Sequence, residues 1–158
     1  MIDQKKFYLT KDGLGKIKKE YESLRQIKFA KTNGDVPRIL QSEDLNPEYL
    51  SFQEDLNFLE VRIVELENIL NNAELIISPP KGKQNIIGLG ATVSAEIGGQ
   101  SDEFKITGTL EANPAVGMIS DESPVGRALL GHKIGDEVVI SSPVKTIYKI
   151  KKIRYLSS

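Results

Sequence analysis

The residues of this chain best suited to metal chemistry lie in a short acidic stretch, residues 42–48. Its letters are Ser-Glu-Asp-Leu-Asn-Pro-Glu, so three carboxylates, those of Glu43, Asp44 and Glu48, crowd together. Mg²⁺ prefers oxygen ligands and is often held by one or two carboxylates, with water or substrate phosphate completing its shell. This stretch can therefore supply part of a Mg²⁺ site that another molecule completes. The ordinary alternative is a soluble turn, and Glu48 also favours the positive N-terminus of a following helix.

Two segments with helical periodicity flank the acidic stretch and would position it. In residues 10–31, Thr10 is suited to the N-cap, and in residues 47–75, Asn46 and Pro47 suit the N-cap and first helical position. The apolar residues of the first segment recur at steps of three and four: Leu14, Ile17, Tyr21 and Leu24. Those of the second segment alternate the same steps without interruption: Tyr49, Phe52, Leu56, Leu59, Ile63, Leu66, Leu70 and Ala73. The pattern predicts two helices, the second roughly 43 Å long.

The charges beside the two apolar seams predict that these helices pair with each other. Residues 11–31 contain seven Lys or Arg and three Asp or Glu, whereas residues 47–75 contain one Arg and seven Asp or Glu. Opposite charges favour an antiparallel hairpin over association of like with like. In this hairpin Leu24 should lie across from residues 63–66, with a short helical turn at residues 37–41. The acidic stretch would then form the tip, far from the rest of the chain.

The pattern changes after a linker at residues 78–85, which contains Pro-Pro and Gly. Alternating apolar residues predict the strands of a small antiparallel sheet at 91–97, 104–110, 137–140 and 146–155. Ser123 and Pro124 should begin a short helix that stops at Gly131. The predicted fold class is α+β, with an N-terminal coiled-coil hairpin in residues 1–77 and a sheet domain with one short helix in residues 86–158.

Composition argues against a catalytic site of the chain's own. The 158 residues carry a formal charge of −1, no Cys and a single His, His132, which argues against a structural zinc site or a His-based triad. No signal segment or apolar run long enough for a bilayer is visible, so a cytoplasmic monomer without membrane contact is expected. A basic run near the C-terminus is ordinarily a solvated face, with nucleic-acid binding as the alternative. This run consists of Lys145, Lys149, Lys151, Lys152 and Arg154.

Several motifs in order make the chain resemble the Gre family of bacterial transcript-cleavage factors. The most specific block is Gly-Thr-Leu-Glu-Ala-Asn-Pro at residues 108–114. The other matching segments are Leu9-Thr10 with Gly13, Glu43-Asp44-Leu45, Glu48-Tyr49, Arg62-Ile63, Gly90-Ala91-Thr92-Val93, Ile119-Ser120, Glu122-Ser123-Pro124, Ala128-Leu129-Leu130-Gly131 and Gly135-Asp136-Glu137-Val138. The resemblance therefore covers nearly the whole chain.

The resemblance implies an antiparallel coiled coil, an FKBP-like C-terminal domain and a site of action on RNA polymerase. The globular domain would dock at the rim of the secondary channel, through a segment that includes Ser123, Pro124, Ala128, Leu129 and Gly131. The coiled coil would enter the channel, where the tip acids help to hold a second Mg²⁺ and orient a water that cleaves the 3′ end of backtracked RNA. The polymerase is then the catalyst, and this chain alone is not an enzyme.

The tip departs from the family pattern, which reads Gly-Asp-Leu, two residues, Asn, one residue, Glu-Tyr. Asp44 matches the first family acid, but two residues before Asn46 are missing, including the second acid, and Glu43 replaces the Gly. Asp44 is therefore the expected metal ligand, with Glu43 or Glu48 as its partner. Two alternatives stay open. One is a Gre-like factor that modulates or inhibits polymerase without cleavage, and the other is a prolyl isomerase or peptide-binding module.

Overall fold

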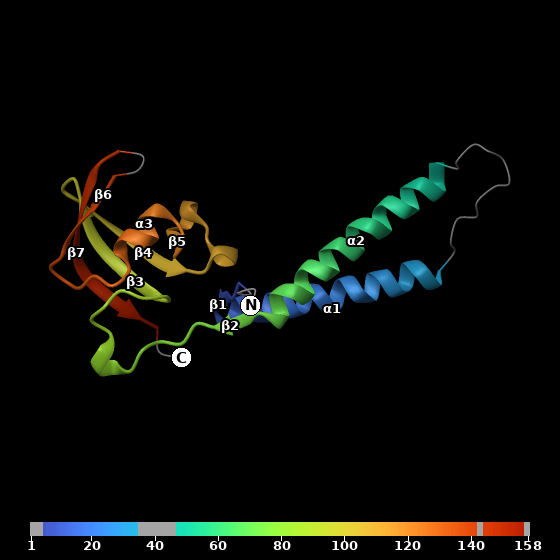
Figure 1. Cartoon of the computed structure of the whole chain (residues 1–158), viewed down its shortest axis with the longest axis horizontal. Coiled ribbons are helices and arrows are strands. Elements are labelled where there is room, and N and C mark those ends of the chain that lie inside the picture. Colours follow the sequence, from blue (N-terminus) through green and yellow to red (C-terminus); the bar gives the residue numbers. More distant parts are fainter. Residues whose placement is uncertain (1–4, 35–46, 142–143, 157–158) are drawn as a thin grey trace. The chain divides into compact units, whose positions relative to one another are not determined.

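The computed structural model describes residues 5–34, 47–141 and 144–156, which form two compact units (Figure 1). One unit contains Leu14–Asn72, and the other contains the described residues up to Gly13 and from Ala73 onward. The boundaries between these units differ from the predicted domain boundary. The reason is that both ends of the helical segment pass into strands that join the sheet-containing unit. The tip acids Glu43 and Asp44, and the short turn expected at residues 37–41, lie outside the described residues.

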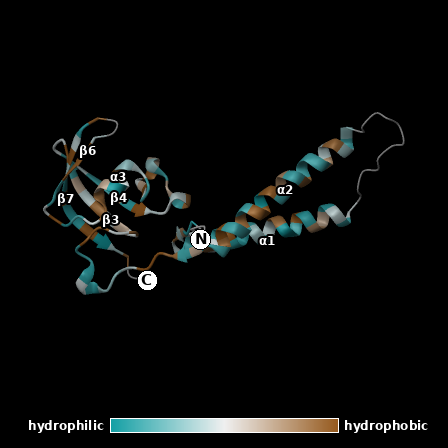
Figure 2. Cartoon of the chain, in the orientation of Figure 1, coloured by the Kyte–Doolittle hydropathy of each residue, from teal (hydrophilic) through white to brown (hydrophobic). Residues whose placement is uncertain are grey.

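Two long helices, α1 (Lys11–Asn33) and α2 (Pro47–Asn71), supply the helical unit. The predicted seam is confirmed on α2, where Ile63 and Leu66 are buried and every other seam position is at least partly covered. Figure 2 shows hydrophobic bands recurring along both helices. Ion pairs join the helices in antiparallel order: Arg62 with Glu20 at 2.8 Å, Lys28 with Glu60 at 3.6 Å and Lys31 with Asp55 at 3.2 Å. The predicted antiparallel hairpin is confirmed.

The register of the hairpin follows from these pairs. The contacts of Glu20 with Arg62, Tyr21 with Glu67 and Lys28 with Glu60 flank Leu24 along α1 and place it across from about residues 58–64 of α2, which overlaps the predicted 63–66. The Arg62 guanidinium donates a hydrogen bond that lowers the pKa of Glu20, in spite of some burial. This bidentate contact is the most specific polar link between the helices, since both guanidinium nitrogens reach the same carboxylate.

The prediction that the second helix runs to Leu75 was wrong, because α2 ends at Asn71 and the chain continues as strand β2 (Ala73–Leu75). β2 pairs in parallel with β1 (Phe7–Leu9), and the Ile76 amide donates to the Leu9 carbonyl at 2.8 Å. The Asn72 side chain donates to a backbone carbonyl of the last helical turn, a local bond that competes with further helix. With 25 residues, α2 spans about 37 Å.

A curled five-stranded sheet of order β5-β4-β3-β7-β6 forms the main part of the other unit. Its strands are β3 (Ala91–Ile97), β4 (Gln100–Thr107), β5 (Met118–Ser120), β6 (Glu137–Ile140) and β7 (Thr146–Tyr155), with the short helix α3 (Pro124–Leu129). The α+β class is confirmed, with one correction: β5 is parallel to β4. Inward-facing residues of β3, β4, β6 and β7 pack with Leu129 of α3 in one apolar core. No helix in the described ranges combines the length and apolar character that crossing a bilayer requires.

The Gly-Thr-Leu-Glu-Ala-Asn-Pro block at residues 108–114 contacts the first strand of the chain rather than extending a strand itself. Leu110, predicted in a strand, lies in the 3-10 turn η2 (Thr109–Glu111) and is 43% exposed. Gly108 is buried against the backbone carbonyl of Tyr8, where a Cβ would collide. The Glu111 carboxylate accepts from the Thr10 amide at 2.8 Å and from the Thr10 hydroxyl at 2.6 Å. η2 therefore fastens β1 and the first turn of α1 to the sheet unit.

Candidate functional site

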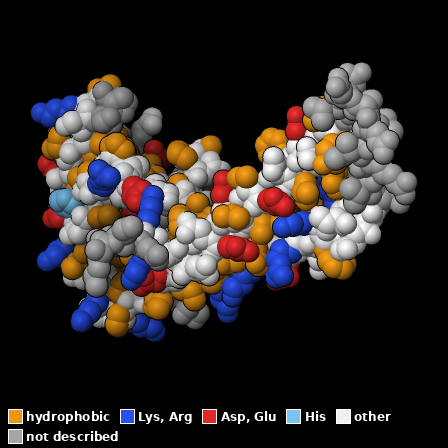
Figure 3. Space-filling model, turned by 45° about the vertical axis from the view of Figure 1, so that its right-hand side comes forward, with side chains coloured by type: hydrophobic (Ala, Val, Ile, Leu, Met, Phe, Trp, Pro, Cys, Tyr) orange, Lys and Arg blue, Asp and Glu red, His pale blue; other side chains and the backbone are white. Residues whose placement is uncertain are grey.

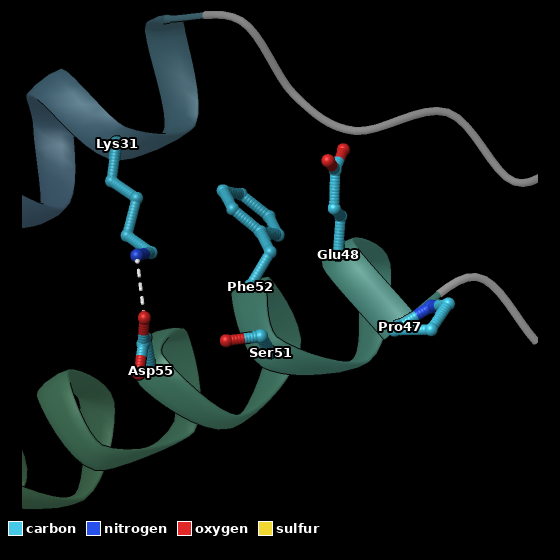
Figure 4. A pocket seen from close by; sticks show the side chains of 6 residues that line it. All are labelled: Lys31, Pro47, Glu48, Ser51, Phe52 and Asp55. Atoms are coloured by element: carbon cyan, nitrogen blue, oxygen red, sulfur yellow. Dashed lines mark hydrogen bonds and ion pairs between the residues drawn. The ribbon is translucent and has the colours of Figure 1, made fainter.

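The described part of the hairpin tip is an open hollow of about 500 Å³ between the end of α1 and the start of α2 (Figure 4). The Lys31 ammonium contacts the Asp55 carboxylate at 3.2 Å and lies 5.2 Å from the centre of the Phe52 ring. This cation is therefore held by a charge and an aromatic face together, although both contacts are partly exposed and weak individually. The lining residues are Lys31, Pro47, Glu48, Ser51, Phe52 and Asp55.

Glu48 is the one predicted tip acid that the structure describes. It lies in the first turn of α2, directly after Pro47, and is exposed. In Figure 4 its side chain points up from the helix start, on the other side of the Phe52 ring from the Lys31–Asp55 pair. Its carboxylate therefore lies at the end of the hairpin, where the positive end of the helix dipole attracts it.

Asp55 is a second acid near the tip, and the sequence interpretation did not single it out. It follows Glu48 by seven residues, or about two helical turns, which places the two on one face of α2. The seven-residue spacing between these two acids was the feature of the sequence that could have identified Asp55. Among the residues that the structure describes, no group of three His, Asp or Glu side chains is arranged to hold a metal ion. The described acids by themselves therefore do not form a metal site.

The segment predicted to bind a partner forms a rigid corner in the sheet unit. Ser123 is the N-cap of α3, accepting from the Gly126 amide at 3.1 Å and donating to the Ser120 carbonyl at 2.7 Å. Gly126 is buried so closely against the Ser120 carbonyl that no side chain fits there. Burial and the neighbouring Glu122 raise the pKa of Asp121 beside this corner. The capping prediction for this helix is confirmed.

The five predicted partner-binding residues differ in how far solvent reaches them. Pro124 and Gly131 are exposed, Ser123 and Ala128 are partly covered, and Leu129 is fully buried in the core. Leu129 therefore contributes to the position of α3 and does not offer a surface. An additional exposed group was missed: Arg127 lies within α3, and its side chain forms no ion pair or hydrogen bond with the described residues. The feature of the sequence that could have identified it is a single Arg within a short, capped helix.

The basic run of the C-terminal strand is largely paired across the sheet. Three of its members contact acidic residues on other strands of the sheet, with nitrogen-to-oxygen distances of 3.8, 3.5 and 2.9 Å. The pairs are Lys149 with Glu137, Lys151 with Glu96 and Arg154 with Glu103. Cross-strand pairing of this kind reduces the positive potential of the face, so the solvated-face interpretation is favoured over nucleic-acid binding.

The aromatic residues of the sheet unit do not gather at one place. Phe104 and Tyr148 stack with ring centres 5.9 Å apart. Tyr155 lies seven residues further along β7, about 23 Å away in an extended strand, and its hydroxyl donates to the Ile86 carbonyl at 2.6 Å. An isomerase pocket would need more aromatic rings around one proline, so this arrangement gives that alternative little support.

Comparisons with known proteins agree on one family across both units. Residues 7–75 match the family described as "Transcription elongation factor, N-terminal", and residues 82–155 match "Transcription elongation factor, GreA/GreB, C-term". "Transcription elongation factor GreA" of Thermomicrobium roseum is 38% identical over 148 residues, covering 88% of this chain and 90% of that protein. The protein of the same description from Bacillus subtilis is 35% identical, covering 97% and 99%. A solved structure, GreA factor homolog 1 (Gfh1) of Thermus thermophilus, is 28% identical with a TM-score of 0.42, covering 95% and 99%.

Proposed function

The chain belongs to the GreA/GreB family of transcription elongation factors, and we propose that it delivers an acidic hairpin tip into the active centre of bacterial RNA polymerase. The observation that carries this proposal is the α1–α2 hairpin. Cross-helix ion pairs reach as far as Lys31 and Asp55, and the residues that connect the two helix ends include Glu43 and Asp44. A support of about 37 Å therefore ends in carboxylates.

In this proposal the chain lends ligands to chemistry that the polymerase performs. Asp44 is the primary ligand of a second Mg²⁺ shared with the polymerase, and Glu43 or Glu48 is its partner. One or two carboxylates suit Mg²⁺ when other ligands come from elsewhere. When bound, the ion would lower the pKa of a water and stabilise charge on the scissile phosphate. The carboxylates of this chain would orient that water towards backtracked RNA, so that cleavage leaves a new 3′ end in the polymerase.

The exposed corner at α3 is the proposed docking surface on the polymerase. Pro124 and Gly131 are exposed on a scaffold that the Ser123 cap holds, and Arg127 adds a cation that pairs with none of the described residues. A preformed surface of this kind loses little conformational entropy on binding. Replacing Pro124 or Arg127 should weaken polymerase binding while the hairpin remains folded.

A channel-binding factor without cleavage activity is the second candidate, and one feature favours it. Pro47 starts α2 only three residues after Asp44, so the interval that holds the second acid in the family pattern is shortened. Glu48 can replace that acid only from within the first helical turn, where the helix terminus also attracts it. In this case the chain would occupy the channel and change polymerase activity without hydrolysing RNA.

RNA cleavage in halted elongation complexes tests both candidates. Added wild-type protein should shorten the labelled RNA, and Asp44→Asn should abolish this stimulation without changing polymerase binding. Glu43→Gln should reduce cleavage more than Glu48→Gln, because Glu48 lies in the first turn of α2, where the helix terminus competes for its carboxylate. Normal cleavage with Asp44→Asn would refute the metal role, whereas binding without any stimulated cleavage at high Mg²⁺ would support the non-cleaving factor.

A further inference from the structure

The outer face of α2 carries a second row of apolar side chains, which are exposed. Phe58 is 78% exposed, Val61 59% and Val64 62%, and Leu50, about two turns before Phe58, is 38% exposed. We call these four residues the outer stripe. Residues two positions apart on a helix point about 200° apart, so Val61 faces away from the buried seam residue Ile63. The outer stripe is therefore separate from the contact between α1 and α2.

A hollow and the carboxylate of Glu54 lie beside the outer stripe. Glu54, Asn57, Phe58 and Val61 line an open depression of about 450 Å³. The acids Asp55 and Glu60 form ion pairs with α1, but the Glu54 carboxylate forms no ion pair or hydrogen bond with the described residues. A carboxylate beside exposed Phe and Val side chains offers a partner an apolar contact and one position for a cation.

The charge of α2 decides between the kinds of partner that could cover this face. Its 25 residues include six Asp or Glu and one Arg, and Figure 3 shows acidic and hydrophobic side chains interspersed on the visible face of the helices. Like charges would oppose pairing with α2 of a second copy, and nucleic acid or an anionic membrane would be repelled. An apolar protein surface that carries Lys or Arg is complementary to it.

We propose that the outer stripe of α2 docks on an apolar protein surface with a cationic group opposite Glu54. This proposal rests on the function proposed above, and the partner surface is then part of the polymerase wall that the hairpin passes. The stripe would then hold the hairpin along its length, whereas the tip acids act at its end. It supplies affinity that is independent of the chemistry at the active centre.

Binding of labelled full-length protein to core RNA polymerase tests the proposal. The double variant Phe58→Ala/Val61→Ala should bind about tenfold more weakly or worse, as expected for central apolar contacts. Alanine favours helix, so this variant should keep the far-UV circular dichroism of the wild type. Phe29→Ala is the matched control, because Phe29 is 70% exposed on α1 and lies outside the stripe. Its affinity should stay within about twofold of wild type.

Salt dependence tests the charged part of the same surface. Glu54→Gln should make the affinity less sensitive to salt, and Glu54→Lys should weaken binding further. Equal affinity of the double variant and wild type would overturn the stripe alone, while a wild type that does not bind polymerase would overturn the proposed function as well. Wild-type dimers in sedimentation that the double variant abolishes would assign the stripe to a second copy and also overturn the proposal.

Discussion

Gly13 on α1 is predicted to be required because the Glu111 carboxylate occupies the space of its missing side chain. A Cβ at residue 13 would collide with that carboxylate, whose oxygens accept from the Thr10 amide at 2.8 Å and the Thr10 hydroxyl at 2.6 Å. The same hydroxyl accepts from the Gly13 amide at 3.1 Å and so caps α1. In Gly13→Ala, Glu111 can swing aside, but only by giving up its bonds to Thr10.

The expected magnitude follows from these bonds. Hydrogen bonds to a charged group contribute about 1.5–3 kcal/mol each, and partial exposure places these two near the lower end. Replacing a helical Gly by Ala returns about 1 kcal/mol of helix propensity. Gly13→Ala should therefore lower the free energy of unfolding by about 1–3 kcal/mol. In a Glu111→Ala background the obstacle is gone, so the same substitution should be neutral or stabilising by up to about 1 kcal/mol.

A double-mutant cycle checks this prediction by urea unfolding followed with circular dichroism. Hydrogen exchange at the Thr10 and Gly13 amides supplies a local readout, since both should exchange faster in Gly13→Ala and in Glu111→Ala. A coupling of about 2–4 kcal/mol between the two positions is expected, which is the cost of the lost bonds, because the gain in helix propensity is the same in both backgrounds and cancels. Equal destabilisation by Gly13→Ala in both backgrounds would show that Glu111 is not the obstacle, and the reasoning would fail.

Three further perturbations follow from other contacts in the structure. Gly108→Ala should cost about 3 kcal/mol or more, because its Cβ would meet the rigid backbone carbonyl of Tyr8, and urea unfolding will measure the loss. Arg62→Met should remove the part of hairpin stability that depends on ionised Glu20. Because Arg62 lowers the pKa of Glu20, this stabilisation is present above the ordinary Glu pKa of about 4.3 and is lost as pH falls below it. The urea midpoint of wild type should thus fall more steeply on acidification than that of the variant; parallel curves would contradict this. Ser123→Ala should lower stability by about 1 kcal/mol through loss of the α3 cap, whereas an unchanged melting temperature would show that the cap is dispensable.

Local patterns predicted most of the elements correctly. Steps of three and four identified α1 and α2, and alternation identified β3 and β7 with their observed bounds. These succeed because helix and strand periodicity place apolar side chains on one face within a single segment. The opposite charges of the helices likewise predicted their pairing, and the ion pairs of Lys28 with Glu60 and of Lys31 with Asp55 follow that pattern. The acidic character of the tip is also a property of sequence alone.

Tertiary structure decided what depends on residues far apart in the chain. The bonds from Thr10 to Glu111 span 101 positions, and the β1–β2 pair that ends α2 early joins the two ends of the helical segment. No local period encodes such contacts, because each partner by itself looks like an ordinary polar or apolar residue. For the same reason, the burial of Leu129 could not be predicted from the sequence. The spacing of apolar residues in a six-residue helix does not tell which face of α3 contacts a sheet formed by distant strands.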